Sequence, residues 1–171
     1  LMDDALAMAR LDPGALRPEA EPVRLGGLVR DALEALGPAA RDRPVVVRDP
    51  EGATAWLDRR LLRLALKQLL DNALKYSPPG AAVEVEVVAG PRAVAVEVTD
   101  HGAGIPPAEQ ARIFERLYRS PGVENRIPGS GLGLGIALSI ARAHGGDLTL
   151  RSRPGETVFR LSLPAAPEAA A

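Results

Sequence analysis

The chain has 171 residues, enough for one domain with a sizeable core and a short appendage. A net charge of −1 and a hydrophobic content of 46% argue against a disordered chain and against a strongly basic nucleic-acid surface. The absence of cysteine excludes disulfides and cysteine-based metal sites, and no apolar run approaches the roughly 18 residues of a membrane span.

The N-terminal part of the chain carries two helical patterns. Residues 1–10 have the pattern of the end of an amphipathic helix, which Asp12-Pro13-Gly14 interrupts, so we expect the chain to be a fragment of a longer protein. Residues 23–41 carry apolar side chains at helical spacing, and Gly37-Pro38 disturbs the end of that pattern. This second helix is expected to pack one face on a sheet.

A longer helix follows two short apolar segments, residues 45–47 and 54–57, which are predicted to be strands. Asp58 suits the cap of this helix, and Ser77-Pro78-Pro79-Gly80 ends it. Residues three and four apart share one face of a helix, so a polar stripe lies opposite the leucines. The stripe consists of Gln68, Asn72, Lys75 and Tyr76.

The rest of the chain predicts most of a sheet and one more core helix. Residues 83–87 and 93–98 alternate with period two around a Gly90-Pro91 turn, which indicates a hairpin. Residues 106–128 contain a short helix and then a loop, 120–128, that has little to bury and is expected to be mobile without a ligand. We expect a helix over 132–143, strands over 147–150 and 158–163, and a disordered tail over 165–171. These elements predict an α/β two-layer sandwich with helices on one face of a mixed, mostly antiparallel sheet.

Three short motifs in fixed order describe a nucleotide pocket. Residues 69–76 place an amide, an acid and an ammonium on a helix, while residues 100–106 place a carboxylate at the end of a strand before two glycines. Those glycines allow the backbone to approach a flat ligand. Residues 129–135 form a glycine-rich turn that opens a helix, where free N–H groups and the positive end of the helix dipole suit phosphate oxygens.

The order and residues of these segments resemble those of the catalytic ATP-binding domain of bacterial sensor histidine kinases, in the GHKL (HATPase) superfamily. Residues 69–76 resemble the N box, 100–106 the first glycine box, 113–119 the F box and 129–135 the second glycine box. Four boxes in this order are more specific than one glycine motif. The resemblance implies the Bergerat-type fold, with the end of a dimerisation helix and a linker in 1–20, the ATP-binding domain in 21–164 and a tail in 165–171.

The resemblance also implies a role for each site residue. Asn72 is implied as the magnesium ligand, with Gln68 as a second one, and Asn72, Lys75 and Arg119 form the implied catalytic set. Asp100 is the acid implied to accept a hydrogen bond from the exocyclic amine of adenine. The other implied nucleotide-binding residues are Gln68, Tyr76, Gly102, Gly104, Ile105, Tyr118, Gly129, Ser130, Gly131, Leu132, Gly133, Leu134 and Thr157.

Ordinary structural roles compete with several of these assignments. Asn72 and Arg119 could be solvated surface groups, Asp100 could cap a turn, and Asp71 is expected to be a helix-surface acid only. His101 is expected to be exposed, and His144, followed by Gly145-Gly146, is expected to end a helix. We expect neither histidine to accept phosphate.

The chain departs from the family pattern at two places. Gln68 replaces the usual Asn, and no Glu stands there to serve as the general base found in related ATPases. Gly155-Glu156-Thr157 stands where the kinases tend to have Gly-x-Gly-Thr. These departures keep open a nucleotide-binding regulatory module without transfer activity, and more weakly an ATPase that drives conformational change.

The function that the resemblance implies is that of a protein histidine kinase. The domain would bind ATP with Mg²⁺ and transfer the γ-phosphoryl group to a histidine on a separate dimerisation domain, absent here, in two-component signal transduction. Its implied partners are its own dimerisation and phosphotransfer domain and the receiver domain of a response regulator. We expect a homodimeric full-length protein with a cytoplasmic catalytic domain and no nucleic-acid partner; the isolated fragment can be monomeric, and only upstream segments can reach an inner membrane.

Overall fold

The computed structural model describes residues 16–121, 127 and 129–165 of the chain. The helix end expected in 1–10, most of the loop 120–128 and all of the tail 165–171 except its first residue lie outside the described residues. Within the described ranges, no helix combines the length and apolar character needed to cross a membrane.

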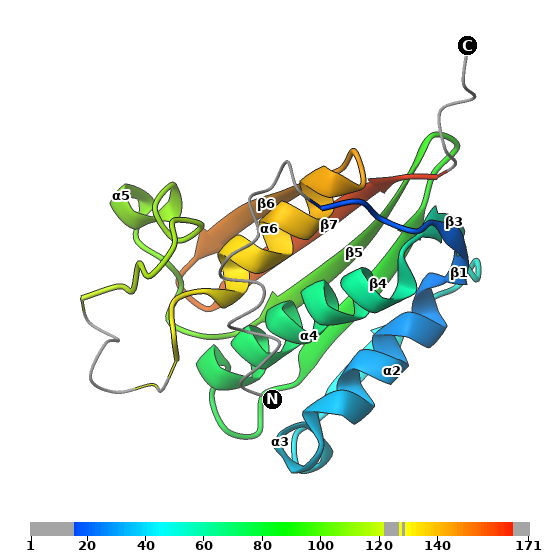
Figure 1. Ribbon diagram of the computed structural model, residues 1–171. Coiled ribbons are helices and arrows are strands. Elements are labelled where there is room, and N and C mark those ends of the chain that lie inside the picture. Colours follow the sequence, from blue (N-terminus) through cyan, green and yellow to red (C-terminus); the bar gives the residue numbers. More distant parts are fainter. Residues whose placement is uncertain (1–15, 122–126, 128, 166–171) are drawn as a thin grey trace.

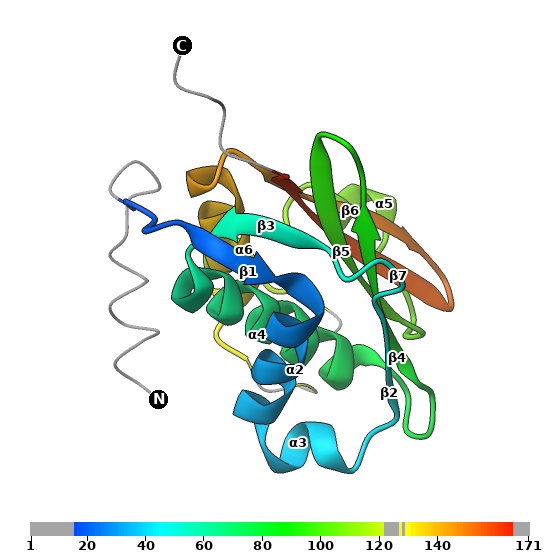
Figure 2. The same cartoon turned by 90° about the vertical axis from the view of Figure 1, so that its right-hand side faces the viewer.

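The described residues form two layers (Figures 1 and 2). One layer is a five-stranded sheet with the strand order β2 (Val45–Arg48), β4 (Val83–Ala89), β5 (Ala93–Asp100), β7 (Glu156–Pro164) and β6 (Asp147–Arg153), in which β2 and β4 are parallel and the other pairs antiparallel. Helices α2 (Leu25–Leu36), α4 (Arg59–Tyr76) and α6 (Gly133–Ala143) cover one face of this sheet, and β1 (Glu21–Arg24) and β3 (Thr54–Leu57) pair antiparallel beside them. The predicted sandwich of helices on a mixed, mostly antiparallel sheet is therefore confirmed.

The elements, in chain order, are β1 (Glu21–Arg24), α2 (Leu25–Leu36), α3 (Pro38–Arg41), β2 (Val45–Arg48), β3 (Thr54–Leu57), α4 (Arg59–Tyr76), β4 (Val83–Ala89), β5 (Ala93–Asp100), α5 (Pro107–Gln110), α6 (Gly133–Ala143), β6 (Asp147–Arg153) and β7 (Glu156–Pro164). The hairpin, the helix capped by Asp58 and the last core helix all lie where the sequence predicts them. β6 and β7 are longer than expected, because polar residues continue the ladder at the turn between them.

The core lies between the sheet and the helices. The inward residues of the hairpin, Val83, Val85 and Val96 among them, are fully buried, while Glu84 and Glu86 between them point to the other face. The inward valines meet the leucine side of α4, where Leu62 and several other leucines are also fully buried. Burial of each such side chain contributes about 1.5 to 3 kcal/mol, so the period-two and period-3.6 patterns determine the two layers.

The helix expected over 23–41 begins two residues later. Glu21–Arg24 is a strand instead, in which Val23 pairs with Ala55 of β3 and is completely buried. A buried cross-strand contact outweighs the weak helical preference of so short a segment. The expected disturbance at Gly37-Pro38 is confirmed, since Gly37 has φ +62° and Pro38 begins the separate helix α3.

Asp58 connects helices α4 and α6. One of its carboxylate oxygens accepts the N–H groups of Arg60 and Leu61 at 3.0 Å each, which confirms it as the cap of α4, and the other accepts the N–H of Glu19 at 3.0 Å. The Asp58 N–H donates to Nε2 of His144 at 3.1 Å, and Nδ1 of His144 bonds the Ile140 carbonyl at 2.8 Å. Only a neutral imidazole with its proton on Nδ1 satisfies both bonds.

We expect the contribution of His144 to make the domain less stable as the pH falls below about 6.5. Burial lowers the pKa of His144 from its ordinary 6.5, against the opposing effect of the Ile140 carbonyl. The unfolded chain then binds the proton more readily, so the contribution is full above pH 6.5 and is lost as the pH falls toward the folded pKa. Urea unfolding should show this loss, and His144→Gln should remove it.

His101 supplies the internal control. Its hydrogen bond to Glu84 raises its pKa, so its contribution has the opposite sign and is lost as the pH rises. His101→Gln should therefore steepen the acid-side loss of stability. An unchanged pH dependence in His144→Gln would contradict the hydrogen-bonding scheme.

Candidate nucleotide-binding site

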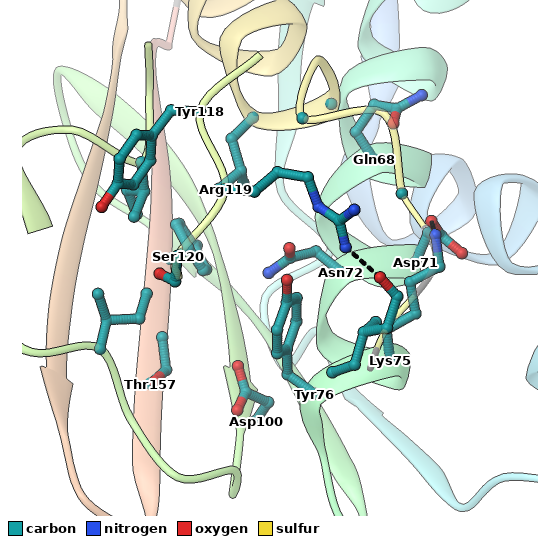
Figure 3. Close-up of a pocket in the computed structure, with 18 of the residues that line it drawn as sticks. Gln68, Asp71, Asn72, Lys75, Tyr76, Asp100, Tyr118, Arg119, Ser120 and Thr157 are labelled. Carbon is teal, nitrogen blue, oxygen red and sulfur yellow. Dashed lines mark hydrogen bonds and ion pairs between the residues drawn. The ribbon is translucent and has the colours of Figure 1, made fainter. Parts of the chain in front are cut away.

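One cavity of about 390 Å³ lies between the C-terminal half of α4, the ends of β5 and β7, and the loops before and after α5. Figure 3 shows the α4 side chains facing Tyr118, Ser120 and Thr157 across it. Of the residues implied to bind nucleotide or metal, only Gly102 and Leu132 do not line it. Those that do are Gln68, Asn72, Lys75, Tyr76, Asp100, Gly104, Ile105, Tyr118, Arg119, Gly129, Ser130, Gly131, Gly133, Leu134 and Thr157.

The polar stripe of α4 forms one wall. Asn72 projects into the middle of the cavity, and Lys75 lies at one end, where its Nζ contacts a carboxylate oxygen of Asp71 at 2.5 Å. Asp71 also lines the cavity, so the expectation of a surface acid alone is too narrow. Gln68 packs against the start of α6, since a Cβ on Gly133 would lie 2.6 Å from its Oε1.

Asp100 lies at the end of β5 between Tyr76 and Thr157 (Figure 3). Its side chain is only 2% exposed, and Oδ1 accepts the N–H of Gly102 at 2.9 Å. Burial raises the pKa of Asp100, although the Gly102 bond opposes that effect. The residue thus does cap a turn, and it also presents a poorly solvated carboxylate to the cavity.

Two glycines bring the loop after β5 against its neighbours. A Cβ on Gly102 would lie 2.5 Å from the Tyr76 carbonyl oxygen, and one on Gly104, which has φ +82°, would lie 2.5 Å from the carbonyl oxygen of Arg153. The Gly155 N–H also donates to the Gly102 carbonyl at 3.0 Å. The loop is therefore held between the end of α4 and the β6–β7 turn, in spite of the Glu156 departure.

The second glycine box leads into α6. No side chain caps the N-terminus of this helix, and Gly131, with φ +70°, accepts the N–H of Leu117 at 2.9 Å. Gly129, Ser130 and Gly133 line the cavity. The N–H groups and positive dipole end of an 11-residue helix therefore lie beside the cavity, where they suit an anion.

Aromatic and cationic groups complete the wall opposite α4. The guanidinium of Arg112 stacks over the Tyr118 ring at 4.4 Å. Arg119 donates to the Ile127 carbonyl and reaches toward the Asp71–Lys75 end (Figure 3). Burial raises the pKa of the Tyr76 hydroxyl; the charge of Arg119 opposes this effect and that of Asp100 adds to it.

Sequence reasoning missed several lining residues. Ile113 and Phe159 follow ordinary apolar patterns, so nothing distinguished them from core residues; Phe114 meets Phe159 edge-on at 6.3 Å. The remaining missed residues are Asp71, Ala103, Ser120 and Ile127. The available signal was a position inside a recognised box, which Asp71, Ala103 and Ile113 share.

Neither histidine lines the cavity. His101 is less exposed than expected: its Nε2 lies 3.0 Å from Glu84 and its Nδ1 3.2 Å from the Gly155 carbonyl. The bond to Glu84 raises the pKa of His101. His144 ends α6, as predicted.

Comparisons with known proteins agree with this geometry. The family model for histidine kinase-, DNA gyrase B- and HSP90-like ATPases matches residues 57–167. A probable sensor histidine kinase of Mycobacterium tuberculosis, TcrY, is 38% identical over 96% of this chain and 35% of its own length. The chain spans 42% of the SenX3 kinases of Mycobacterium tuberculosis and Mycobacterium bovis, at 34% identity, so it corresponds to part of such proteins.

Solved structures show the same likeness. The mycobacterial sensor histidine kinase MprB superposes with a TM-score of 0.73 at 34% identity, over 87% of this chain and 99% of that one. Full-length ShkA in complex with AMPPNP superposes with a TM-score of 0.78 at 30% identity, over 98% of this chain and 36% of that one.

We expect Gly104→Ala to destabilise the domain far more than Gly80→Ala. Both glycines have φ +82°, so both variants carry the strain of a left-handed residue, roughly 1 to 2 kcal/mol. A Cβ at position 80 meets nothing within 4 Å, whereas one at position 104 lies 2.5 Å from backbone. Moving the β6–β7 turn adds about 1 to 3 kcal/mol. Equal losses in urea unfolding would contradict the close packing of the loop.

Proposed function

Because the chain belongs to the family of histidine kinase-, DNA gyrase B- and HSP90-like ATPases, we propose that it is the ATP-binding catalytic domain of a sensor histidine kinase. It binds ATP with Mg²⁺ and passes the γ-phosphoryl group to a histidine on a dimerisation domain of the same protein. One observation carries the proposal: a buried carboxylate, a polar helix face and the N-terminus of a second helix converge on one cavity.

Asp100 and the loop after β5 recognise the base. A carboxylate with 2% exposure needs a hydrogen-bond donor, and the exocyclic amine of adenine is one. Guanine presents a carbonyl at the same ring position, which would leave the carboxylate unpaired. Ile113 and Phe159 supply apolar surface, and Gly104 lets backbone approach the ring.

The phosphates lie toward the start of α6. The N–H groups of its first turn and the cations Lys75 and Arg119 neutralise phosphate charge. Mg²⁺ takes most of its ligands from water and phosphate, so it needs few protein ligands. The half-buried carboxamide of Asn72, which faces the cavity, fits as one of them. A bound Mg²⁺ would add charge neutralisation at the transferring phosphoryl group.

Transfer, rather than hydrolysis, is the chemistry that this set of residues suits. Phosphoryl transfer depends mainly on positioning and charge neutralisation. Gln68 lies where related ATPases place a basic Glu, and a carboxamide cannot take a proton from water. The acceptor histidine therefore comes from the dimerisation domain of a homodimer, and a response regulator receives the phosphoryl group afterwards.

We expect the chain to bind ATP more tightly than GTP and Asp100→Ala to weaken ATP about tenfold to a hundredfold. A hydrogen bond to a charged group contributes about 1.5 to 3 kcal/mol, which corresponds to this range. Calorimetry at saturating Mg²⁺ measures it, with the exposed Asp42 as control through Asp42→Ala. Equal affinity of the parent chain for ATP and GTP would contradict the assignment of Asp100 to adenine recognition.

We also expect the chain, supplied with Mg-ATP and the dimerisation segment of its own full-length protein, to label that segment on histidine with acid-labile phosphate. Asn72→Ala should abolish labelling, and Lys75→Ala should slow it by removing a phosphate contact. Lys67→Ala is the matched control, since Lys67 is the other lysine of the chain, lies on the same helix and does not line the cavity.

The outcome of this labelling experiment also separates transfer from nucleotide sensing alone. If another kinase labels the segment but this domain never labels it at saturating Mg-ATP, transfer by this domain is refuted. The chain would then be a nucleotide-binding regulatory module, in line with the departures at Gln68 and Glu156.

A further inference from the structure

Ser152, which does not line the cavity, connects two groups that do. It lies on β6, where its Oγ accepts the N–H of Ile105 at 2.8 Å and lies 2.7 Å from Oγ1 of Thr157. Gln110 holds the same junction from outside, because its Nε2 donates to the carbonyl oxygens of Ile105 at 2.9 Å and Ser152 at 3.3 Å. Ser152 therefore has a fixed place in the hydrogen-bond network of the first glycine box.

Either hydroxyl of the Ser152–Thr157 pair can be the donor, and the bond from the Ile105 N–H favours Ser152, because accepting a hydrogen bond polarises the Ser152 O–H group. Ser152 Oγ already accepts from Ile105, so its own proton is free to be donated to Thr157. Thr157 then accepts from Ser152, and its own proton must point elsewhere. Thr157 is 3% exposed and lines the cavity, so the direction left for this proton is into the cavity.

Thr157 is the direct cross-strand partner of Asp100. The β5–β7 register pairs the two residues, and cross-strand partners project from the same face of a sheet. The cavity thus presents an acceptor, the Asp100 carboxylate, beside a donor, the Thr157 hydroxyl (Figure 3). Adenine carries the complementary set, because ring nitrogens that accept hydrogen bonds flank its exocyclic amine on both sides.

We propose that Ser152 is a positioning residue for purine recognition, which donates to Thr157 and so commits the Thr157 hydroxyl to donate to a ring nitrogen of the base. This inference rests on the proposed function, since it needs a purine beside Asp100. It adds a residue outside the cavity that determines whether a hydroxyl group inside the cavity donates a hydrogen bond to the ligand.

Calorimetry with ATP and with purine riboside triphosphate, which lacks the amine but keeps the ring nitrogens, tests the inference. Ser152→Ala should weaken both ligands by the same factor, about 3- to 10-fold, the equivalent of one ordinary hydrogen bond. Asp100→Ala should weaken ATP much more than purine riboside triphosphate. Ser152→Thr keeps the hydroxyl and should bind ATP within about twofold of the parent.

A double-mutant cycle separates this role from simple support of the loop. In a Thr157→Val background, Ser152→Ala should cause no further loss of ATP affinity. An equal loss in both backgrounds would overturn the inference, because Ser152 would then act only by holding Ile105. Ser152→Cys, with a weakly donating thiol of similar size, gives the same comparison if Ser152→Ala does not fold.

The proposed function has a separate readout in the same experiment. A parent chain that binds no ATP overturns the proposed function and this inference together. A parent chain that binds ATP without coupling between Ser152 and Thr157 overturns this inference alone.

Discussion

The antiparallel packing of α4 and α6 on one face of the sheet is the constraint on which the site depends. The N-terminus of α4 meets the C-terminus of α6 through the bond from the Asp58 N–H to His144. α4 has 18 residues and α6 has 11, so α4 continues about two turns beyond the start of its neighbour. Those last turns carry Asn72, Lys75 and Tyr76 into the cavity that α6 opens on.

The electrostatics of the two helix ends follow from the same packing. The positive end of α6 lies at the cavity, while the negative end of α4 lies next to it and needs compensation. Arg43 supplies it by donating to the carbonyl oxygens of Leu74, Ser77 and Pro78 at 3.2, 2.9 and 3.1 Å. An anionic ligand can therefore meet the N–H groups of α6 and the cations of the cavity, while Arg43 already bonds carbonyl groups at the end of α4.

The sequence predicted the fold from local periodicity, and most of the cavity from the boxes that resemble those of the kinase family. Alternating valines identified the hairpin, and a polar stripe opposite leucines identified the working face of α4. β1 was missed because its burial comes from pairing with β3, which is distant in sequence. Phe159 and Ser152 were missed for a similar reason: only tertiary packing brings them to the cavity or to Thr157. Asp71 lies four residues before Lys75 on α4, so helical spacing could have placed it on the same face. The roles of the individual residues remain predictions.

A structure of this chain bound to Mg²⁺ and a non-hydrolysable ATP analogue tests the central claim most directly. We expect the exocyclic amine of adenine within about 3 Å of the Asp100 carboxylate and the phosphates at the first turn of α6. A nucleotide bound outside this cavity, or bound in it with the base turned away from Asp100, would contradict the assignment of the site.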